Sequence, residues 1–306
     1  MNPTGQIKTP LETEVTDRQS GSEYRFGRNA EYKLIVARTL EERKRAWRLV
    51  YRSYLDKGYA QPDPDELWYG VYDALMQTTT FLVSRNGRDV ATLTIVFDSA
   101  LGLPADKLYC DELDVLRRNG RRLCEIISLV SEESDRKQCI EVLKHMFKPA
   151  YLMACKLVDA TDFIITVNPH HSSYYERKML FRRHGDIKFY DKVNGAPAVL
   201  LILDLEEAPG RYIEHYGLET GSFVHHFLDA RTVSEAVWFL AENIGRRGRD
   251  ELLAFFRRKK PSYFAVIDHE GAVRDTFRGA HSEDAAPACA QACPPDAERM
   301  MASGMA

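Results

Sequence analysis

A carboxylate lies inside an apolar stretch of this sequence. Glu125 occurs in the run 123–130, whose length and β-branched content are typical of a buried strand. Burying an unpaired carboxylate costs free energy, so Glu125 is either one half of an ion pair or a working group whose pKa is shifted by burial. The sequence leaves both interpretations open: a general base, or a structural partner of an arginine.

Polar residues also follow the next predicted strand, 163–167. The tetrapeptide Asn-Pro-His-His comes first, and we expect a helix to open at Ser172 or Ser173 and to carry Tyr175. We interpret the tetrapeptide chiefly as a source of strand-end and helix-capping hydrogen bonds.

The remaining pattern places these segments in an α/β domain. Residues 39–42 form a capping box that opens an amphipathic helix, and Asn86-Gly87 marks a hairpin turn. We also expect a short helix over 66–75 and a kink or break at Pro149 in the long helix after 131–136. The predicted order is strand, helix, helix, strand, strand, helix, strand, helix, strand, helix, strand, strand. It favours a mixed, strongly twisted sheet with helices on both faces.

Changes in composition divide the chain into parts. We expect a flexible lead over 1–30, the α/β domain over 31–205, a helix-rich extension over 206–278 and a disordered tail over 279–306.

Composition also limits the function. The net charge is −3, which does not favour general binding to nucleic acid. The six cysteines lack metal-binding spacing and fit free thiols in a reducing compartment. No apolar run reaches the ~18 residues that a membrane span needs. We therefore expect a cytoplasmic protein that uses neither a metal nor a redox cofactor.

The motifs together resemble those of the GNAT acyltransferases, and within them the FeeM-like family of long-chain N-acyl amino acid synthases, which is related to the acyl-homoserine lactone synthases. The resemblance covers about residues 31–206. It rests on the order of these segments: 102–106, the strand with Glu125, Asn-Pro-x-His at 168–171, 175–181 and 193–199. It implies an enzyme that moves a long-chain fatty acyl group from acyl carrier protein to the amine of an amino acid.

The resemblance also implies roles for individual residues. Glu125 would deprotonate the acceptor amine, and Tyr175 would protonate the leaving thiolate, with core packing as the alternative for Tyr175. Asn168 and His171 would shape the site. Two parallel strands of a GNAT sheet splay apart and leave backbone N–H groups free to hold the thioester oxygen. Here those groups would belong to Ile127, Ser128 and Leu129.

An amino-acid acceptor also needs a cation for its carboxylate. The lactone-synthase relatives carry an arginine four residues before an aromatic residue, but counting back from Tyr54 gives Val50. Arg48 and Arg52 are substitutes, although most surface arginines are simply solvated. Asp73 resembles an acidic residue that helps those relatives to bind the acceptor, or it is a helix-end charge.

The composition of the loop 131–137 indicates which kind of acyl donor the protein uses. Coenzyme A-dependent GNATs bind pyrophosphate with a glycine-rich loop at a helix N-terminus, whereas this loop has no glycine and three acidic residues. We therefore expect acyl-phosphopantetheine on acyl carrier protein as co-substrate. The cations expected to meet its phosphate or the acidic carrier are Arg136, Lys137, Arg121 and Arg122. Solvated cations at a helix end are the alternative for the basic run 117–122.

Two other functions stay open at this point. A lactone synthase would need the missing arginine and would not explain the extra C-terminal region. A catalytically silent acyl-binding protein would fit Leu180, which stands where the superfamily usually has glycine.

The segment 245–260 mixes cations with leucine and phenylalanine. It predicts weak binding to an anionic membrane, at the inner face, or packing of its apolar residues on the domain. Packing is the favoured interpretation.

Overall fold

The computed structural model describes residues 23–75, 77–217, 226–227, 230–243 and 249–263. These residues contain one open sheet with the strand order β1-β2-β3-β4-β5-β6-β9-β7, and β8 pairs with β9. The strands are β1 (Tyr24–Phe26), β2 (Tyr32–Val36), β3 (Thr79–Arg85), β4 (Arg88–Phe97), β5 (Leu123–Ser131), β6 (Asp162–Val167), β7 (Arg182–Arg183), β8 (Lys188–Tyr190) and β9 (Ala196–Asp204). β5 and β6 pair in parallel, and the other described pairs are antiparallel.

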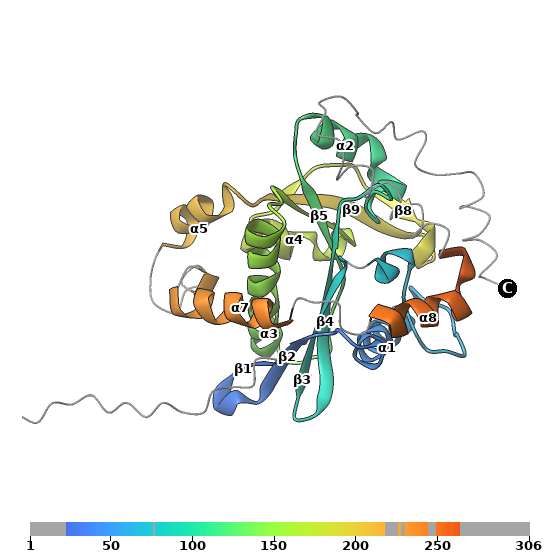
Figure 1. The fold of residues 1–306 in the computed structure, drawn as a ribbon. Helices are drawn as coiled ribbons and strands as arrows, with labels where there is room; N and C mark the ends of the chain where they lie inside the picture. Colours follow the sequence, from blue (N-terminus) through green and yellow to red (C-terminus); the bar gives the residue numbers. More distant parts are fainter. Residues whose placement is uncertain (1–22, 76, 218–225, 228–229, 244–248, 264–306) are drawn as a thin grey trace, which may run out of the picture.

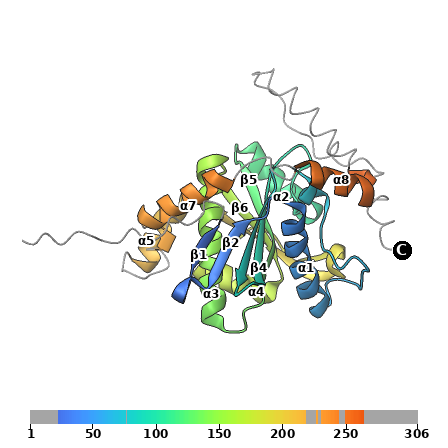
Figure 2. The same cartoon turned by 60° about the horizontal axis from the view of Figure 1, so that its bottom comes forward.

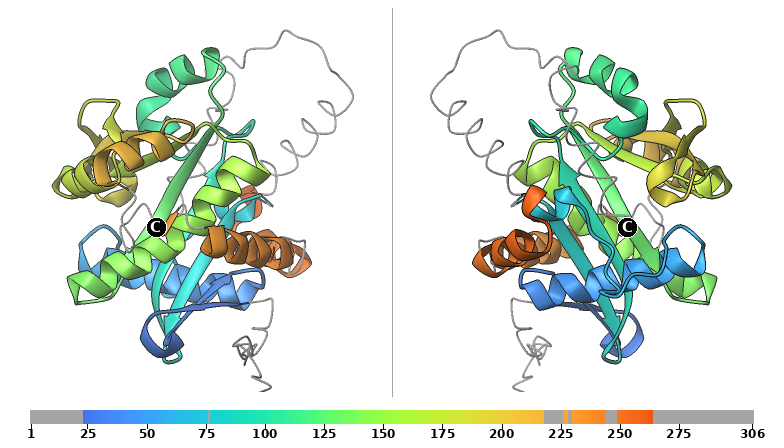
Figure 3. Two further views of the ribbon diagram at one scale, coloured as in Figure 1. Left: turned by 90° about the vertical axis from the view of Figure 1, so that its left-hand side faces the viewer. Right: turned by 90° about the vertical axis from the view of Figure 1, so that its right-hand side faces the viewer.

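Helices cover both faces of this sheet (Figures 1 and 2). They are α1 (Leu40–Asp56), α2 (Asp106–Arg118), α3 (Arg136–Leu152), α4 (Pro169–Lys178), α5 (Ala208–Tyr216), α7 (Ala230–Asn243) and α8 (Arg249–Lys259). α3, α5 and α7 lie on one side and α1 and α8 on the other, and Figure 3 shows the two sides in turn. This is the mixed, twisted sheet with helices on both faces that the sequence predicts.

From β2 onward the elements follow the predicted order, with the short strand β7 added after α4. The predicted capping box opens α1, because Thr39 Oγ1 accepts from Glu42 N at 3.2 Å and Glu42 Oε2 accepts from Thr39 N at 2.9 Å. The turn at Asn86 and Gly87, both with positive φ, joins β3 to β4. Local sequence signals therefore define much of this domain.

Two predictions near the N-terminus are wrong. Tyr24–Phe26 falls in the segment expected to be a flexible lead, but it pairs with β2 and buries Phe26. The expected helix over 66–75 is only the 3₁₀ turn Val71–Ala74, since Glu66 adopts a left-handed conformation with φ 52° where that helix was to begin.

Two helix boundaries also differ from the predictions. α3 runs through Pro149, and the irregular turn comes afterwards as the π-helical segment Met153–Leu157. A proline removes the N–H that would bind the carbonyl four residues earlier, and the wider π turn begins within one turn of it. α4 begins at Pro169 rather than at Ser172 or Ser173, because the Asn168 side chain caps it and proline suits the first helical position.

The two faces of β5 belong to different cores. Cys124 and Ile126 point into the larger core, which α3, α5 and α7 cover. Leu123 and Ile127 point the other way, into the smaller core formed with α2 and the 3₁₀ turn. Glu125 lies between Leu123 and Ile127 on that second face, since side chains alternate along a strand.

α8 packs on the α/β domain. Its Leu252, Phe255 and Phe256 are buried in a cluster with Trp47 of α1 and Tyr69. The apolar side chains that we considered for weak membrane contact are therefore already buried, and packing is their role in this structure.

No helix in the described part of the chain is both long enough and apolar enough to cross a membrane. The tail expected over 279–306 lies outside the described residues.

Candidate active site

The parallel strands β5 and β6 separate at Glu125. The register joins them at three pairs, Leu123 with Asp162, Cys124 with Phe163 and Glu125 with Ile164, and no further pair follows in the described strands. β5 nevertheless continues along β4 to Ser131, and β6 continues along β9 to Val167. The sheet therefore opens between two strands at the position of Glu125.

β5 is irregular within this open part. Ile127 pairs with Thr94 of β4 and Val130 pairs with Thr92, so one residue of β4 stands opposite two of β5. Ser128 in this bulge has φ 51°, in the left-handed region. A bulge takes backbone groups out of the ladder and re-aims them. The three amides expected to hold the thioester oxygen lie here, at Ile127, Ser128 and Leu129.

Glu125 is buried, with 2% of its surface exposed. Its Oε2 accepts a hydrogen bond of 2.7 Å from the Ala105 N–H, at the start of α2. Burial raises the pKa of Glu125 to about 8, and Asp106 adds to the increase, while the Ala105 N–H, Lys192 and Thr166 oppose it. The Thr166 hydroxyl lowers the pKa of Glu125, but its oxygen has no hydrogen-bond partner in the structure.

This environment differs from that of an ion-pair partner. In the described part of the chain, no arginine or lysine forms a salt bridge with Glu125, and its direct polar contact is a backbone N–H. A buried carboxyl with a pKa near neutrality suits proton transfer. The geometry therefore favours the working-group interpretation of Glu125.

Tyrosines from three elements interact with this region. Tyr54 lies on α1, Tyr175 on α4 and Tyr190 at the end of β8. Burial raises the pKa of all three, that of Tyr54 to about 12; Glu125 and Tyr54 act on Tyr190, and Tyr54 acts on Tyr175. None of these hydroxyls has a hydrogen-bond partner among the described residues.

Tyr175 is held by aromatic packing. Its ring centroid lies 5.4 Å from that of Tyr174 and 6.0 Å from that of Phe181, both edge-on. The turn after α4 passes through Leu180, whose φ is 55°. Leucine therefore adopts here the conformation that a glycine would favour, and the departure from the superfamily residue leaves the turn intact.

Asn168 connects the site to the segment that follows α1. Its Oδ1 accepts from the His170 N–H at 3.0 Å, which caps α4, and its Nδ2 donates to the Tyr59 hydroxyl at 3.3 Å. His171 is exposed, and its backbone N–H donates to the Asn168 carbonyl. The favoured interpretation of helix capping agrees with these contacts.

Asp73 lies beneath the site. Its Oδ1 accepts from Trp47 Nε1 at 2.9 Å and its Oδ2 accepts from the Gly70 N–H at 2.7 Å. Burial raises the pKa of Asp73, which is 6% exposed. Both oxygens are thus occupied in positioning Trp47 and Gly70, so Asp73 supports the acceptor region instead of presenting a free carboxylate to a ligand.

The two arginines considered for the acceptor carboxylate point elsewhere. Arg52 is exposed and pairs with Glu132 at 3.2 Å. Arg48 is exposed on the outer side of α1. The structure does not bring either of them to Glu125, because the buried face of α1 is formed by other residues of the helix.

The acidic residues of the loop before α3 already bind groups of this protein. Asp135 caps α3 by accepting from the N–H groups of Lys137 and Gln138 at 2.9 and 3.0 Å. Glu132 pairs with arginines of α1 and β4, and Glu133 pairs with Arg85. The side chains of Arg136 and Lys137 are exposed at this end of α3.

Arginines of the basic run 117–122 form ion pairs within the domain. Arg121 binds Asp162 and Asp204, both at 2.6 Å, and Arg117 binds three aspartates. Arg122 is exposed but pairs with Asp159 at 3.1 Å. The Arg121 pairs join the beginnings of β5 and β6 to the end of β9, at the opposite end of the strands from the opening.

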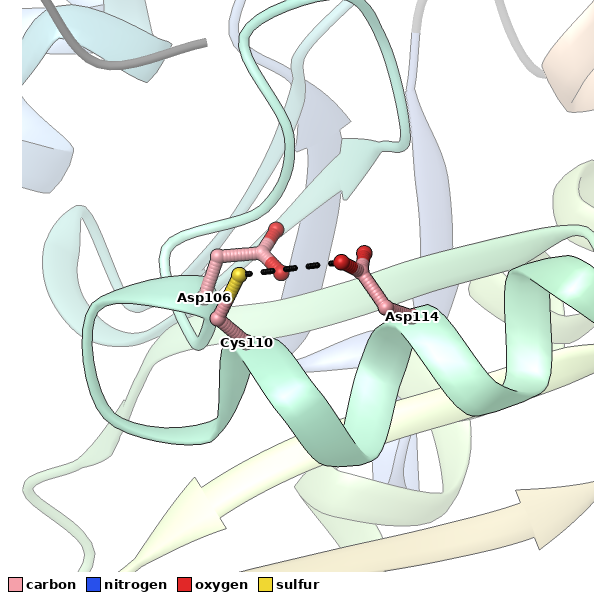
Figure 4. Close-up of side chains that lie close together, drawn as sticks. All are labelled: Asp106, Cys110 and Asp114. Carbon is pink, nitrogen blue, oxygen red and sulfur yellow. Dashed lines mark hydrogen bonds between the residues drawn. The ribbon is translucent and has the colours of Figure 1, made fainter. Parts of the chain in front are cut away.

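One acidic cluster lies close enough together for a metal, as Figure 4 shows: Asp106, Cys110 and Asp114 of α2. Cys110 Sγ lies 4.0 Å from Asp114 Oδ2. Both carboxylates are bound by Arg117, at 2.6 and 2.9 Å. Cys110 is disulfide-bonded, so it differs from the free thiols that we expected. The arginine already supplies the positive charge that a cation would bring.

Sequence reasoning missed Lys192, which lies in the 3₁₀ turn Asp191–Val193 between β8 and β9. Its charge acts on both Glu125 and Asp73. A single lysine in a turn has no periodicity or spacing that marks it. The one available signal was its position directly before the Val-Asn-Gly-Ala-Pro motif at 193–197.

Comparisons with known proteins agree with this geometry. The family model described as N-acyl amino acid synthase FeeM matches residues 45–204. The solved structure of FeeM, an N-acyl amino acid synthase from uncultured soil microbes, is 25% identical with a TM-score of 0.52, and the match covers 58% of this chain and 93% of FeeM.

Two further structures are similar at lower scores. The first is an acyl-CoA N-acyltransferase from Pseudomonas aeruginosa, with 17% identity and a TM-score of 0.38; the match covers 56% of this chain and 97% of that one. The second is the acyl-homoserine lactone synthase LasI, with 16% identity and a TM-score of 0.41; the match covers 61% of this chain and 95% of LasI. Comparison with curated proteins gave no match.

An open mixed sheet of this order, with parallel strands that part beside a buried carboxyl, defines an acyltransferase of the GNAT type. Within that class, the chain belongs to the FeeM family of N-acyl amino acid synthases.

Proposed function

We propose that this enzyme transfers a long-chain fatty acyl group from acyl carrier protein to the amine of an amino acid. The observation that carries the proposal is the opening between β5 and β6, with the buried carboxyl of Glu125 at its base. The described activity of FeeM supports the choice of an amino acid as acceptor. The carrier is a cytoplasmic protein, so the proposal also places the reaction in the cytoplasm.

In the proposed reaction, Glu125 accepts a proton from the ammonium group of the amino acid. Only the neutral amine has the electron pair that attacks a thioester carbon. Because burial raises the pKa of Glu125 to about 8, its carboxylate is a stronger base than an ordinary glutamate and the transfer is less unfavourable. The new C–N bond then forms at the carbonyl carbon.

The charge that develops on the carbonyl oxygen needs hydrogen-bond donors. The proposal assigns this task to the backbone N–H groups of the bulge at 127–129, which are fixed before the substrate arrives. Collapse of the intermediate breaks the C–S bond and releases the pantetheine thiolate.

Tyr175 is assigned to the leaving thiolate. Burial raises the pKa of its phenol above the ordinary value near 10, whereas a thiol has a pKa of about 8.5. Complete proton transfer from this phenol to the thiolate would therefore be unfavourable. We assign Tyr175 a hydrogen bond to the thiolate. The thiolate takes its proton from the attacking nitrogen, which must lose a second proton as the amide forms.

The contacts of the loop before α3 support a carrier-bound donor. A pyrophosphate at this helix end would need the N–H groups that Asp135 already binds. The pantetheine of a carrier protein has a single phosphodiester, which needs fewer hydrogen-bond donors than a pyrophosphate. The exposed cations Arg136 and Lys137 lie at the same end of the helix.

The donor is tested with one fatty acyl group presented on acyl carrier protein or on coenzyme A. We expect kcat/KM to be at least about tenfold higher for the carrier. The double variant Arg136→Ala/Lys137→Ala should lower only the carrier value, through lost electrostatic attraction. Lys156→Ala, which removes an exposed lysine elsewhere on the chain, is the control. Equal kcat/KM for the two donors would rule out the carrier preference.

A further inference from the structure

The ammonium group of Lys192 acts on Glu125 and forms no salt bridge with a described residue. Lys192 Nζ is 5.6 Å from the ring centroid of Trp68. It is also 3.3 Å from the place that a β-carbon on Gly70 would occupy, so the missing side chain of Gly70 makes room for it. Asn194 fixes the turn, because its Nδ2 donates to the Gly58 carbonyl at 2.6 Å. The ammonium is thus placed against the segment 58–70.

The charged groups around Lys192 leave its charge incompletely compensated. Asp73 acts on it, but both Asp73 oxygens already accept hydrogen bonds from other groups. Glu125 acts on it too, but with a pKa of about 8 that carboxyl is mostly protonated at neutral pH. Lys107 repels it. Lys192 is an exposed residue, and desolvation of its ammonium lowers its pKa.

We propose that Lys192 binds the α-carboxylate of the amino-acid acceptor. The amine and the carboxylate of an α-amino acid are attached to one carbon, so they need a proton acceptor and a cation that lie near each other. Lys192 lies against Gly70, and the 3₁₀ turn that follows Gly70 packs in the same core as Leu123 and Ile127, the neighbours of Glu125 on that face of β5. This assignment rests on the proposed function, and it replaces the arginine that the sequence lacks.

The proposal defines the acceptor class. A zwitterionic α-amino acid supplies the carboxylate that Lys192 lacks, whereas a simple amine or an amino-acid ester leaves the ammonium without a counter-ion. The enzyme should therefore select acceptors by their free carboxylate, and Lys192 should act on binding more than on the chemical step.

The test compares an amino acid with its methyl ester as acceptors, with kcat and KM measured separately. Lys192→Met removes the charge and keeps most of the side-chain length, and Lys192→Arg keeps the charge. We expect Lys192→Met to raise KM for the amino acid about 10- to 100-fold, the usual effect of losing a hydrogen bond to a charged group. KM for the ester should stay within about twofold, which also shows that the variant is folded. Lys192→Arg should recover part of the loss, and Lys178→Met, an exposed lysine at the end of α4, should change neither value.

Each outcome decides the assignment. If Lys192→Met changes KM for the two acceptors equally, or changes neither, the carboxylate assignment is wrong. If kcat falls for both acceptors, Lys192 takes part in the reaction itself and the assignment is again wrong. If the unmodified enzyme acylates neither acceptor, the proposed function fails, and that result is distinct because it precedes any difference between variants.

Discussion

The two ends of the parallel pair β5–β6 differ in how their charged side chains are paired. At the closed end, Arg121 is held by Asp162 and Asp204 at 2.6 Å. At the open end, Glu125 and Lys192 act on each other, and neither has a salt bridge to a described residue. The paired charges at the closed end connect the strands. The charged groups without a salt bridge at the open end can bind a ligand of opposite charge or accept and release a proton. The contrast separates residues that hold the sheet together from those available for chemistry.

The largest expected effect comes from removing the base at the open end. Glu125→Gln keeps the shape and the Ala105 contact but cannot accept the amine proton. We expect kcat to fall by roughly 10²–10⁴, the range for a general base. Steady-state turnover with the acylated carrier measures it, and circular dichroism checks the fold. A folded Gln variant with near-normal turnover would assign Glu125 to structure alone.

The two ends should also give opposite dependences of stability on pH. The pKa of Glu125 is raised from 4.5 to about 8, so the folded state binds this proton more tightly than the unfolded state. Its contribution to the free energy of unfolding is fully present below pH 4.5 and is lost as the pH rises to about 8, by roughly 4 kcal/mol.

Asp204 behaves in the opposite sense. Burial alone would raise its pKa, but the Glu207 N–H and Arg121 bring it below the ordinary value. Its contribution is present above the unfolded pKa and is lost as the pH falls through the folded one. Urea unfolding from pH 2 to 9 should show the loss toward high pH in the unmodified protein and not in Glu125→Gln, and a loss below about pH 4 in both proteins. The same slope in both proteins would contradict the raised pKa.

Breaking the closed end should affect stability and spare the chemistry. Arg121→Met leaves Asp162, which is 3% exposed, without its cation, and we expect a loss of roughly 2–4 kcal/mol in the free energy of unfolding. Arg122→Met is the matched control, because its exposed pair with Asp159 should contribute less than ~1 kcal/mol. Denaturant unfolding measures both. A normal stability for Arg121→Met, or a loss of kcat in the folded variant, would remove the distinction between the two ends.

The same contrast explains what the sequence could predict. Glu125 stood out because an apolar strand has a regular pattern that one carboxylate interrupts, and the order of elements followed from local periodicity. The ion pairs of Arg121 could not be predicted, because its partners, 41 and 83 residues away, become neighbours only when β6 and β9 join β5. Lys192 was missed for a related reason: its importance depends on Gly70 and Trp68, which no local pattern connects to it.

The most direct measurement is single-turnover acyl transfer from the acylated carrier to an amino acid between pH 6 and 9, with the amide product followed by mass spectrometry. If Glu125 is the base, the rate in the unmodified enzyme should rise with pH and level off near pH 8, where this carboxyl is deprotonated. Glu125→Gln should give a slow rate without that break. No amide product, or the same pH profile in both proteins, would contradict the assignment of the open end as the catalytic site.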